Sequence, residues 1–143
     1  MRVIAIIALL FFSGRFGMAA DVKWHTDFDT AQALAQKEKK KLFIEFTGSD
    51  WCRPCIVLEK TILHSAEFEA FAKKHFVLVQ LDYPFRKKQS EEVKKKNQAV
   101  AEKFAVENYP TVVIVRPSGK VIFREFGDPR LTPAKYVARF KDL

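Results

Sequence analysis

The stretch GSDWCRPCIV, residues 48–57, holds both cysteines of this 143-residue chain, Cys52 and Cys55, with two residues between them. A structural disulfide stabilises a protein mainly by closing a long loop and so restricting the unfolded chain. A bridge across two residues closes almost no loop. The spacing therefore indicates that the two cysteines serve a reaction rather than hold the fold together.

The first 20 residues have the parts of a secretory signal peptide. Arg2 supplies a short positive region, residues 3–12 are apolar, and small residues follow up to Ala20. The apolar run is about half of the roughly 20 residues that a membrane-spanning helix needs, which argues against an uncleaved anchor. We therefore expect a signal peptide over residues 1–20 and a mature domain over residues 21–143. That domain would be periplasmic or secreted, where disulfides persist.

The composition indicates one folded domain with a substantial core, since 48% of the residues are hydrophobic and 14 are phenylalanine. The net charge of +8 comes from lysine clusters interleaved with glutamate, a pattern typical of solvated helix faces. Nucleic acid is therefore not an expected partner. His25, His64 and His75 are scattered, and with two cysteines they offer no four-ligand spacing for a metal.

Hydrophobic periodicity and turn signals predict alternating strands and helices. Strands are predicted over residues 24–28, 41–46, 76–82, 111–115 and 121–126. Helices are predicted over residues 29–39, 52–63, 66–74, 91–104 and 133–141. This order predicts an α/β fold with a central mixed β-sheet flanked by helices.

Two short motifs connect this pattern to a known family. WCRPC, residues 51–55, follows a hydrophobic strand, and YPT, residues 109–111, leads into another; Gly119 and Gly127 fit as well. In these features residues 22–143 resemble the thioredoxin family. The resemblance implies the thioredoxin fold, protein thiol or disulfide substrates, and no bound cofactor. It also implies a cis peptide bond between Tyr109 and Pro110 beside the cysteines.

The position of the cysteines at a helix start explains how they would react. Unpaired N–H groups and the positive end of the helix dipole stabilise a thiolate at Cys52. Arg53 adds to this effect if its guanidinium turns back toward the sulfur. The thiolate would attack a substrate disulfide, and Cys55, one turn further in, would then attack the Cys52 sulfur and release the product. The spacing alone does not choose between reduction and oxidation of the substrate.

Two acidic residues are candidates for proton transfer at this site. Glu45 stands in an otherwise apolar strand, where an acid is costly without a role or a partner. The resemblance implies a buried carboxylate on this strand that relays a proton to the second cysteine, Cys55. The turn before Trp51 is one residue longer than in the family. This difference leaves Asp50 as an alternative acid, and an ion pair with a lysine as an alternative role for Glu45.

Five residues around the cysteines are candidates for contact with a substrate. They are Trp51, Arg53, Pro54, Tyr109 and Pro110. Trp51 is either an amphipathic platform over the thiols or a core side chain. The resemblance implies that a cis Pro110 lets the backbone pair with an extended substrate, and that the pair between the cysteines tunes the redox poise. That pair is Arg53-Pro54 here and usually Gly-Pro in thioredoxins.

Together these features predict an exported, monomeric thiol–disulfide oxidoreductase that reduces protein disulfides and is recharged by a membrane electron donor. An oxidase or isomerase is the alternative within the same chemistry. A binding module with an inert disulfide is the alternative outside it. Residues 83–97 form a longer segment than a minimal thioredoxin needs, and they serve either partner recognition or only as an extended loop.

Overall fold

The computed structural model describes residues 22–143. The predicted signal peptide over residues 1–20 lies outside the described residues. The strands are β1 (Trp24–His25), β2 (Lys41–Thr47), β3 (Phe76–Asp82), β4 (Thr111–Val115) and β5 (Val121–Phe126). The helices are α1 (Phe28–Glu38), α2 (Arg53–Leu58), the π-helix η1 (Glu59–Leu63), α3 (Ala66–His75), α4 (Glu91–Lys103) and α5 (Pro133–Ala138).

The strands form one mixed sheet in the order β1-β3-β2-β4-β5. β2 lies at its centre, parallel to β3 and antiparallel to β4, while β1 adds in parallel to β3 and β5 closes the other edge in a hairpin with β4. The hairpin turn places Gly119 at a positive φ of 87°, a conformation that favours glycine. The mixed sheet confirms the predicted α/β class.

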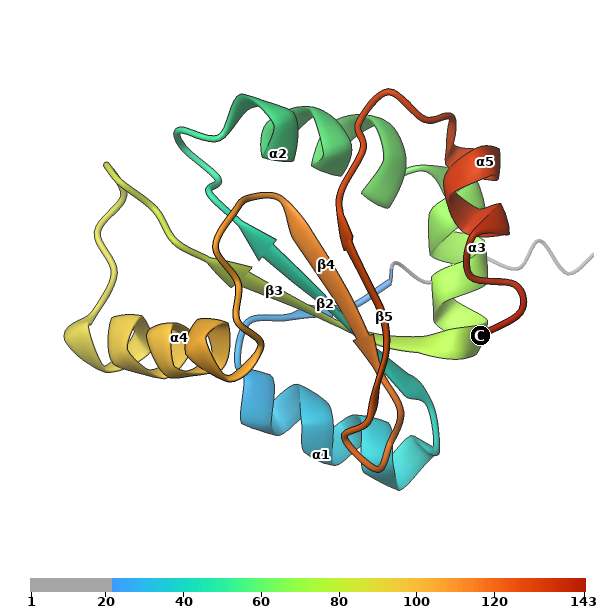
Figure 1. Ribbon diagram of the computed structural model, residues 1–143, viewed down its shortest axis with the longest axis horizontal. Helices are drawn as coiled ribbons and strands as arrows, with labels where there is room; N and C mark the ends of the chain where they lie inside the picture. Colours follow the sequence, from blue (N-terminus) through green and yellow to red (C-terminus); the bar gives the residue numbers. More distant parts are fainter. Residues whose placement is uncertain (1–21) are drawn as a thin grey trace, which may run out of the picture.

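Helices cover both faces of this sheet (Figure 1). Because successive strand residues point to opposite faces, β2 serves two cores. Leu42, Ile44 and Phe46 pack on the side of α1 and α4. Phe43 packs on the opposite side with residues of α2, η1, α3 and α5. Glu45 stands two residues beyond Phe43 and therefore faces the side that carries the cysteine helix.

Side-chain caps fix the helix starts, as the sequence indicates. The side chains of Ser65, Ser90 and Thr132 each accept a hydrogen bond from the backbone three residues further on. The first strand is shorter than predicted and ends at His25, because Asp27 caps α1 by accepting from the Thr30 amide. Within residues 22–143, no helix combines the length and the apolar character required to cross a membrane.

Two helices differ from their predicted extents by more than one residue at an end or in type. The single helix predicted over residues 52–63 consists of α2 and the π-helix η1, with Cys52 as its N-cap. The last helix ends at Ala138 rather than near residue 141. Beyond it the chain continues in turns, and the Phe140 ring remains buried in the core. Neither difference moves the start of α2, which positions the site.

Candidate active site: the disulfide at the start of helix α2

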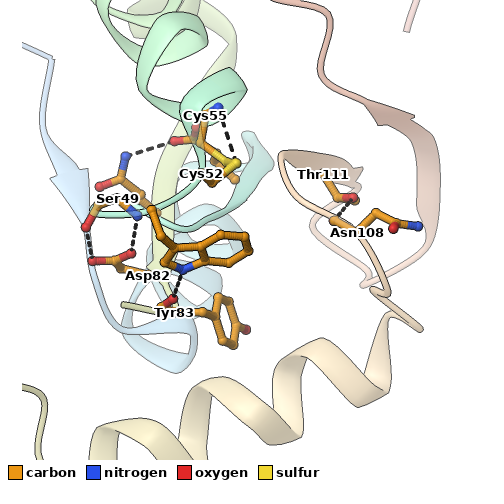
Figure 2. The surroundings of a disulfide bond; sticks show 10 residues. Ser49, Cys52, Cys55, Asp82, Tyr83, Asn108 and Thr111 are labelled. Atoms are coloured by element: carbon orange, nitrogen blue, oxygen red, sulfur yellow. Dashed lines mark hydrogen bonds between the residues drawn. A yellow bond between two sulfur atoms is a disulfide. The ribbon is translucent and has the colours of Figure 1, made fainter. Parts of the chain in front are cut away.

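Cys52 and Cys55 form a disulfide, with 2.02 Å between the sulfur atoms. It lies where the chain leaves β2 and enters α2 (Figure 2). The Cys55 amide donates to the Cys52 sulfur at 3.4 Å, so a backbone N–H of the helix start faces this sulfur. After reduction, the same N–H and the helix dipole stabilise a thiolate at Cys52. Cys52 has 4% of its surface exposed and Cys55 has none. Cys52 is thus the more accessible of the two cysteines, although it is itself largely buried.

Trp51 places an exposed aromatic ring immediately before Cys52. Its side chain is 49% exposed, and its indole N–H donates to the carbonyl oxygen of Tyr83 at 2.8 Å. Its ring meets that of Tyr109 edge to face, with 5.8 Å between the centroids. A Cβ atom at Gly48 would lie 2.5 Å from the indole, so glycine is required where the ring folds over the turn. This exposure fits an amphipathic platform and not a core side chain.

The segment before β4 approaches the disulfide from another part of the chain. The peptide bond between Tyr109 and Pro110 is cis, and the carbonyl oxygen of Pro110 accepts from the Gly127 amide at 2.9 Å. A Cβ atom at Gly127 would lie 2.7 Å from Leu58 in α2 and 3.3 Å from Pro110. The missing side chain at Gly127 therefore lets the Pro110 segment and the cysteine helix pack closely. Pro110 itself is buried, whereas Tyr109 is partly exposed.

Glu45 is fully buried in the middle of β2. Its Oε2 accepts a hydrogen bond from the side-chain amide (Nε2) of Gln80 at 2.9 Å, and its Oε1 has no hydrogen-bond partner. Burial raises the pKa of Glu45 to about 8, and the negative charges of Glu59 and Asp82 act in the same direction, while the bond from Gln80 opposes them. No lysine or arginine of residues 22–143 lies within ion-pair distance. The alternative role of Glu45, a lysine ion pair, is therefore wrong.

Comparison with known proteins places this arrangement in a family. Residues 23–117 match the family described as thioredoxin-like. The chain belongs to the thioredoxin-like family.

Two relatives of this thioredoxin-like chain come from Chlamydia pneumoniae. Disulfide bond reductase DsbH is 34% identical over 123 residues, a match that covers 86% of this chain and 73% of the relative. Thioredoxin-related protein DsbJ is 29% identical over 103 residues, which cover 72% of this chain and only 30% of DsbJ. A solved structure of a DsbH oxidoreductase superimposes with a TM-score of 0.81 at 32% identity, covering 95% of this chain and 93% of that one. These similarities, together with the CxxC disulfide, confirm a thiol–disulfide oxidoreductase.

Asp50, in the turn before Trp51, has a role that the sequence did not predict. Its carboxylate accepts three backbone hydrogen bonds, from Phe85 at 2.9 Å, Arg86 at 2.7 Å and Lys87 at 2.7 Å. These bonds, led by that from the Phe85 amide, hold the pKa of Asp50 below its ordinary value. Of the two candidate acids, Glu45 is therefore the one that retains a proton near neutral pH.

Tyr83 and Gln80 also belong to the site, although no motif in the sequence indicates them. The carbonyl oxygen of Tyr83 accepts the hydrogen bond from the Trp51 indole, and its ring centroid lies 5.2 Å from that of Tyr109. Tyr83 therefore contacts both the WCRPC and the YPT motif. Gln80 lies opposite Glu45 on β3, a pairing that comes from the strand register of the folded sheet and not from a local sequence signal. Among residues 22–143, no three histidine, cysteine or acidic side chains gather as metal ligands.

The remaining predicted substrate-contact residues lie on the surface next to Cys52. Arg53 and Pro54 are exposed immediately after Cys52. Arg53 forms no ion pair with the part of the chain that the structure describes. A guanidinium that turns back toward the Cys52 sulfur stays a prediction.

Proposed function

We propose that the protein is exported and reduces disulfides in other proteins through the Cys52–Cys55 pair. The observation that carries the proposal is the CxxC disulfide at the start of α2, with the first cysteine more accessible than the second. The reductive direction is supported by the relative named a disulfide bond reductase, which is 34% identical. Export is supported by the signal-peptide pattern in residues 1–20, and a membrane electron donor would then return the pair to its dithiol form.

The proposed reaction moves two electrons in two steps. The Cys52 thiolate attacks one sulfur of the substrate disulfide, which forms a mixed disulfide and expels the first substrate thiolate. Cys55 then loses its proton to the minor ionised form of Glu45, which a pKa of about 8 leaves present near neutral pH, and attacks the Cys52 sulfur. The second substrate thiolate leaves, and the Cys52–Cys55 disulfide remains. A pKa of about 8 suits Glu45 to this exchange, because an acid–base group works best near the operating pH.

The substrate would lie across the face formed by Trp51, Arg53, Pro54, Tyr109 and Pro110. Trp51 and Tyr109 offer ring surface, and Arg53 offers a cation beside the reacting sulfur. The backbone at Tyr109 is the expected partner for an extended substrate chain, since the carbonyl oxygen of Pro110 is occupied by Gly127. The protein would act as a monomer.

Insulin reduction tests this proposal, with dithiothreitol as the electron source. The wild-type protein should accelerate the precipitation of reduced insulin chains, and Cys52→Ser should not. Cys55→Ser is the matched variant, because it keeps the nucleophile and should trap a mixed disulfide with the substrate. Equal rates for the wild type and Cys52→Ser would remove the enzymatic claim.

Two further measurements separate the alternatives. Equilibration with glutathione buffers should give a reduction potential below that of the glutathione couple, since a potential well above it would identify an oxidase or isomerase. Iodoacetamide should modify Cys52 of the reduced protein at neutral pH. A thiol that does not react would indicate a binding module instead.

A further inference from the structure

The segment that follows β3 is fixed to the turn that carries the disulfide. Three backbone amides, those of Phe85, Arg86 and Lys87, donate to the Asp50 carboxylate, two residues before Cys52. The Lys87 ammonium also donates to the Ser49 hydroxyl at 2.9 Å. Figure 1 shows this loop and the turn before α2 beyond the same end of the sheet. The loop is therefore a defined part of the surface around the disulfide.

Residues 85–88, which we term the basic loop, expose one large apolar side chain and three cations. Phe85 is 86% exposed, the highest value among the large hydrophobic side chains of residues 22–143. Arg86, Lys87 and Lys88 are exposed as well. No carboxylate in the described part of the chain lies within ion-pair distance of these three cations. Lys87 contacts Ser49, but the side chains of Phe85, Arg86 and Lys88 have no evident role within the fold.

Two acids that contact the basic loop or the turn before the disulfide face inward. Asp50 is turned toward the loop backbone, and Asp82 accepts from the Ser49 amide and hydroxyl at 2.9 and 2.6 Å. Both carboxylates are occupied by donors that belong to the fold. Arg53 and the basic loop present positive charges outward, whereas the exposed Glu91 and Glu92 that follow the loop are paired with Lys94 and Lys96.

We propose that the basic loop is a docking element that selects protein substrates with acidic residues beside their reactive disulfide. The inference rests on the proposed function and names the substrate class for the same site. Positive charges near a reaction centre raise the encounter rate of acidic partners and favour their orientation. Phe85 would contact an apolar side chain of the substrate near its reactive disulfide. A protein partner fits this position because the loop is hydrogen-bonded to Asp50, two residues before Cys52, and a folded substrate is large enough to contact both.

Two peptides provide the test, each with a single cysteine in a mixed disulfide with thionitrobenzoate, whose release is followed by absorbance. They share one sequence except that glutamates flank the cysteine in one and lysines in the other. The measured quantity is the ratio of the rate constants for the acidic and the basic peptide with the reduced protein. Reversing an exposed charge typically alters an interaction by less than about fivefold. We therefore expect the wild-type ratio to exceed one and to fall about three- to tenfold in Arg86→Glu/Lys88→Glu.

Lys73→Glu/Lys74→Glu is the matched control, because it changes the net charge equally at exposed positions of α3. Its ratio should stay within about twofold of the wild type. The wild-type ratio should also decline as salt rises, a measurement that needs no variant. A wild-type ratio of one, or an equal fall in both charge-reversal variants, would overturn the proposal. Phe85→Ala should slow the acidic peptide when that peptide carries a leucine near its cysteine, and an unchanged rate would remove Phe85 from the docking element.

Failure of the proposed function gives a different result. If the reduced wild-type protein does not react with the neutral hydroxyethyl disulfide, the oxidoreductase proposal fails irrespective of the loop. If it does react but shows no preference between the peptides, only the docking proposal fails. Cosedimentation with phosphatidylglycerol vesicles tests whether the basic loop binds a membrane surface instead. Phe85-dependent binding there would assign the basic loop to a membrane surface and overturn the protein-docking proposal.

Discussion

Replacing Glu45 by glutamine should stabilise the protein, and increasingly so as the pH rises. Glutamine keeps the shape of the protonated acid and retains an oxygen that accepts from Gln80. The buried carboxyl has a pKa of about 8, against 4.5 for the unperturbed group. Between these pH values the unfolded chain has released the proton and the folded protein still holds it. The free energy of unfolding of the wild type therefore falls as the pH rises across this interval.

The size of the effect follows from the interval between the two pKa values. One pH unit corresponds to about 1.4 kcal/mol, so the full difference approaches roughly 5 kcal/mol above pH 8. The penalty in the wild type should be about 1 kcal/mol near pH 5 and about 3 kcal/mol near pH 7. Glutamine does not titrate and escapes this penalty. The gap in stability between Glu45→Gln and the wild type should thus widen by about 2 kcal/mol from pH 5 to pH 7.

Guanidinium unfolding of the disulfide form, followed by tryptophan fluorescence at several pH values, measures this gap. Glu107→Gln removes one carboxylate from an exposed loop and serves as the control for the change in net charge. Its difference from the wild type should vary little with pH. A Glu45→Gln difference that is constant across the range would refute the assignment of a proton to buried Glu45 at neutral pH.

Three further perturbations test other parts of the site. Gln80→Leu removes the hydrogen bond that opposes the rise in the pKa of Glu45. The fall in the free energy of unfolding with rising pH should therefore continue about one to two pH units higher in this variant than in the wild type, measured by denaturant unfolding at several pH values. Gly127→Ala places a Cβ 2.7 Å from Leu58 and should lower the free energy of unfolding by about 1–3 kcal/mol, measured by denaturant unfolding. Asp50→Ala frees the backbone amides that this carboxylate binds, and hydrogen exchange at those amides should accelerate while exchange in β2 stays unchanged.

The sequence predicts the strands and most helix starts well, because each depends on local signals. Ser65, Ser90 and Thr132 cap helices within three residues of themselves, and the β4–β5 turn contains a glycine that its geometry needs. The π-helix η1 has no such local signal. A periodic apolar pattern predicts a continuous helix there and cannot distinguish the wider turn.

The pair of cysteines could be predicted from spacing, but their surroundings could not. The contact between Asp50 and the backbone of Phe85 joins positions 35 residues apart, and no periodicity in the sequence connects them. Gln80 and Glu45 are likewise 35 residues apart and meet only because β2 and β3 pair in one register. The cis Tyr109–Pro110 bond was expected from family resemblance, since the residues themselves favour the trans form.

The turn before Trp51 and the loop after β3 form one unit of the fold. The turn places the Asp50 carboxylate beyond the end of β2, and the segment after β3 supplies three amides without strand partners to bind it. These groups are exposed, and water could satisfy them, so the contact adds little to global stability. Its effect is to tie the loop to the turn that leads into Cys52. A loop that is held in place loses less conformational entropy on binding, so Asp50 would contribute to substrate affinity through position rather than through any contact of its own.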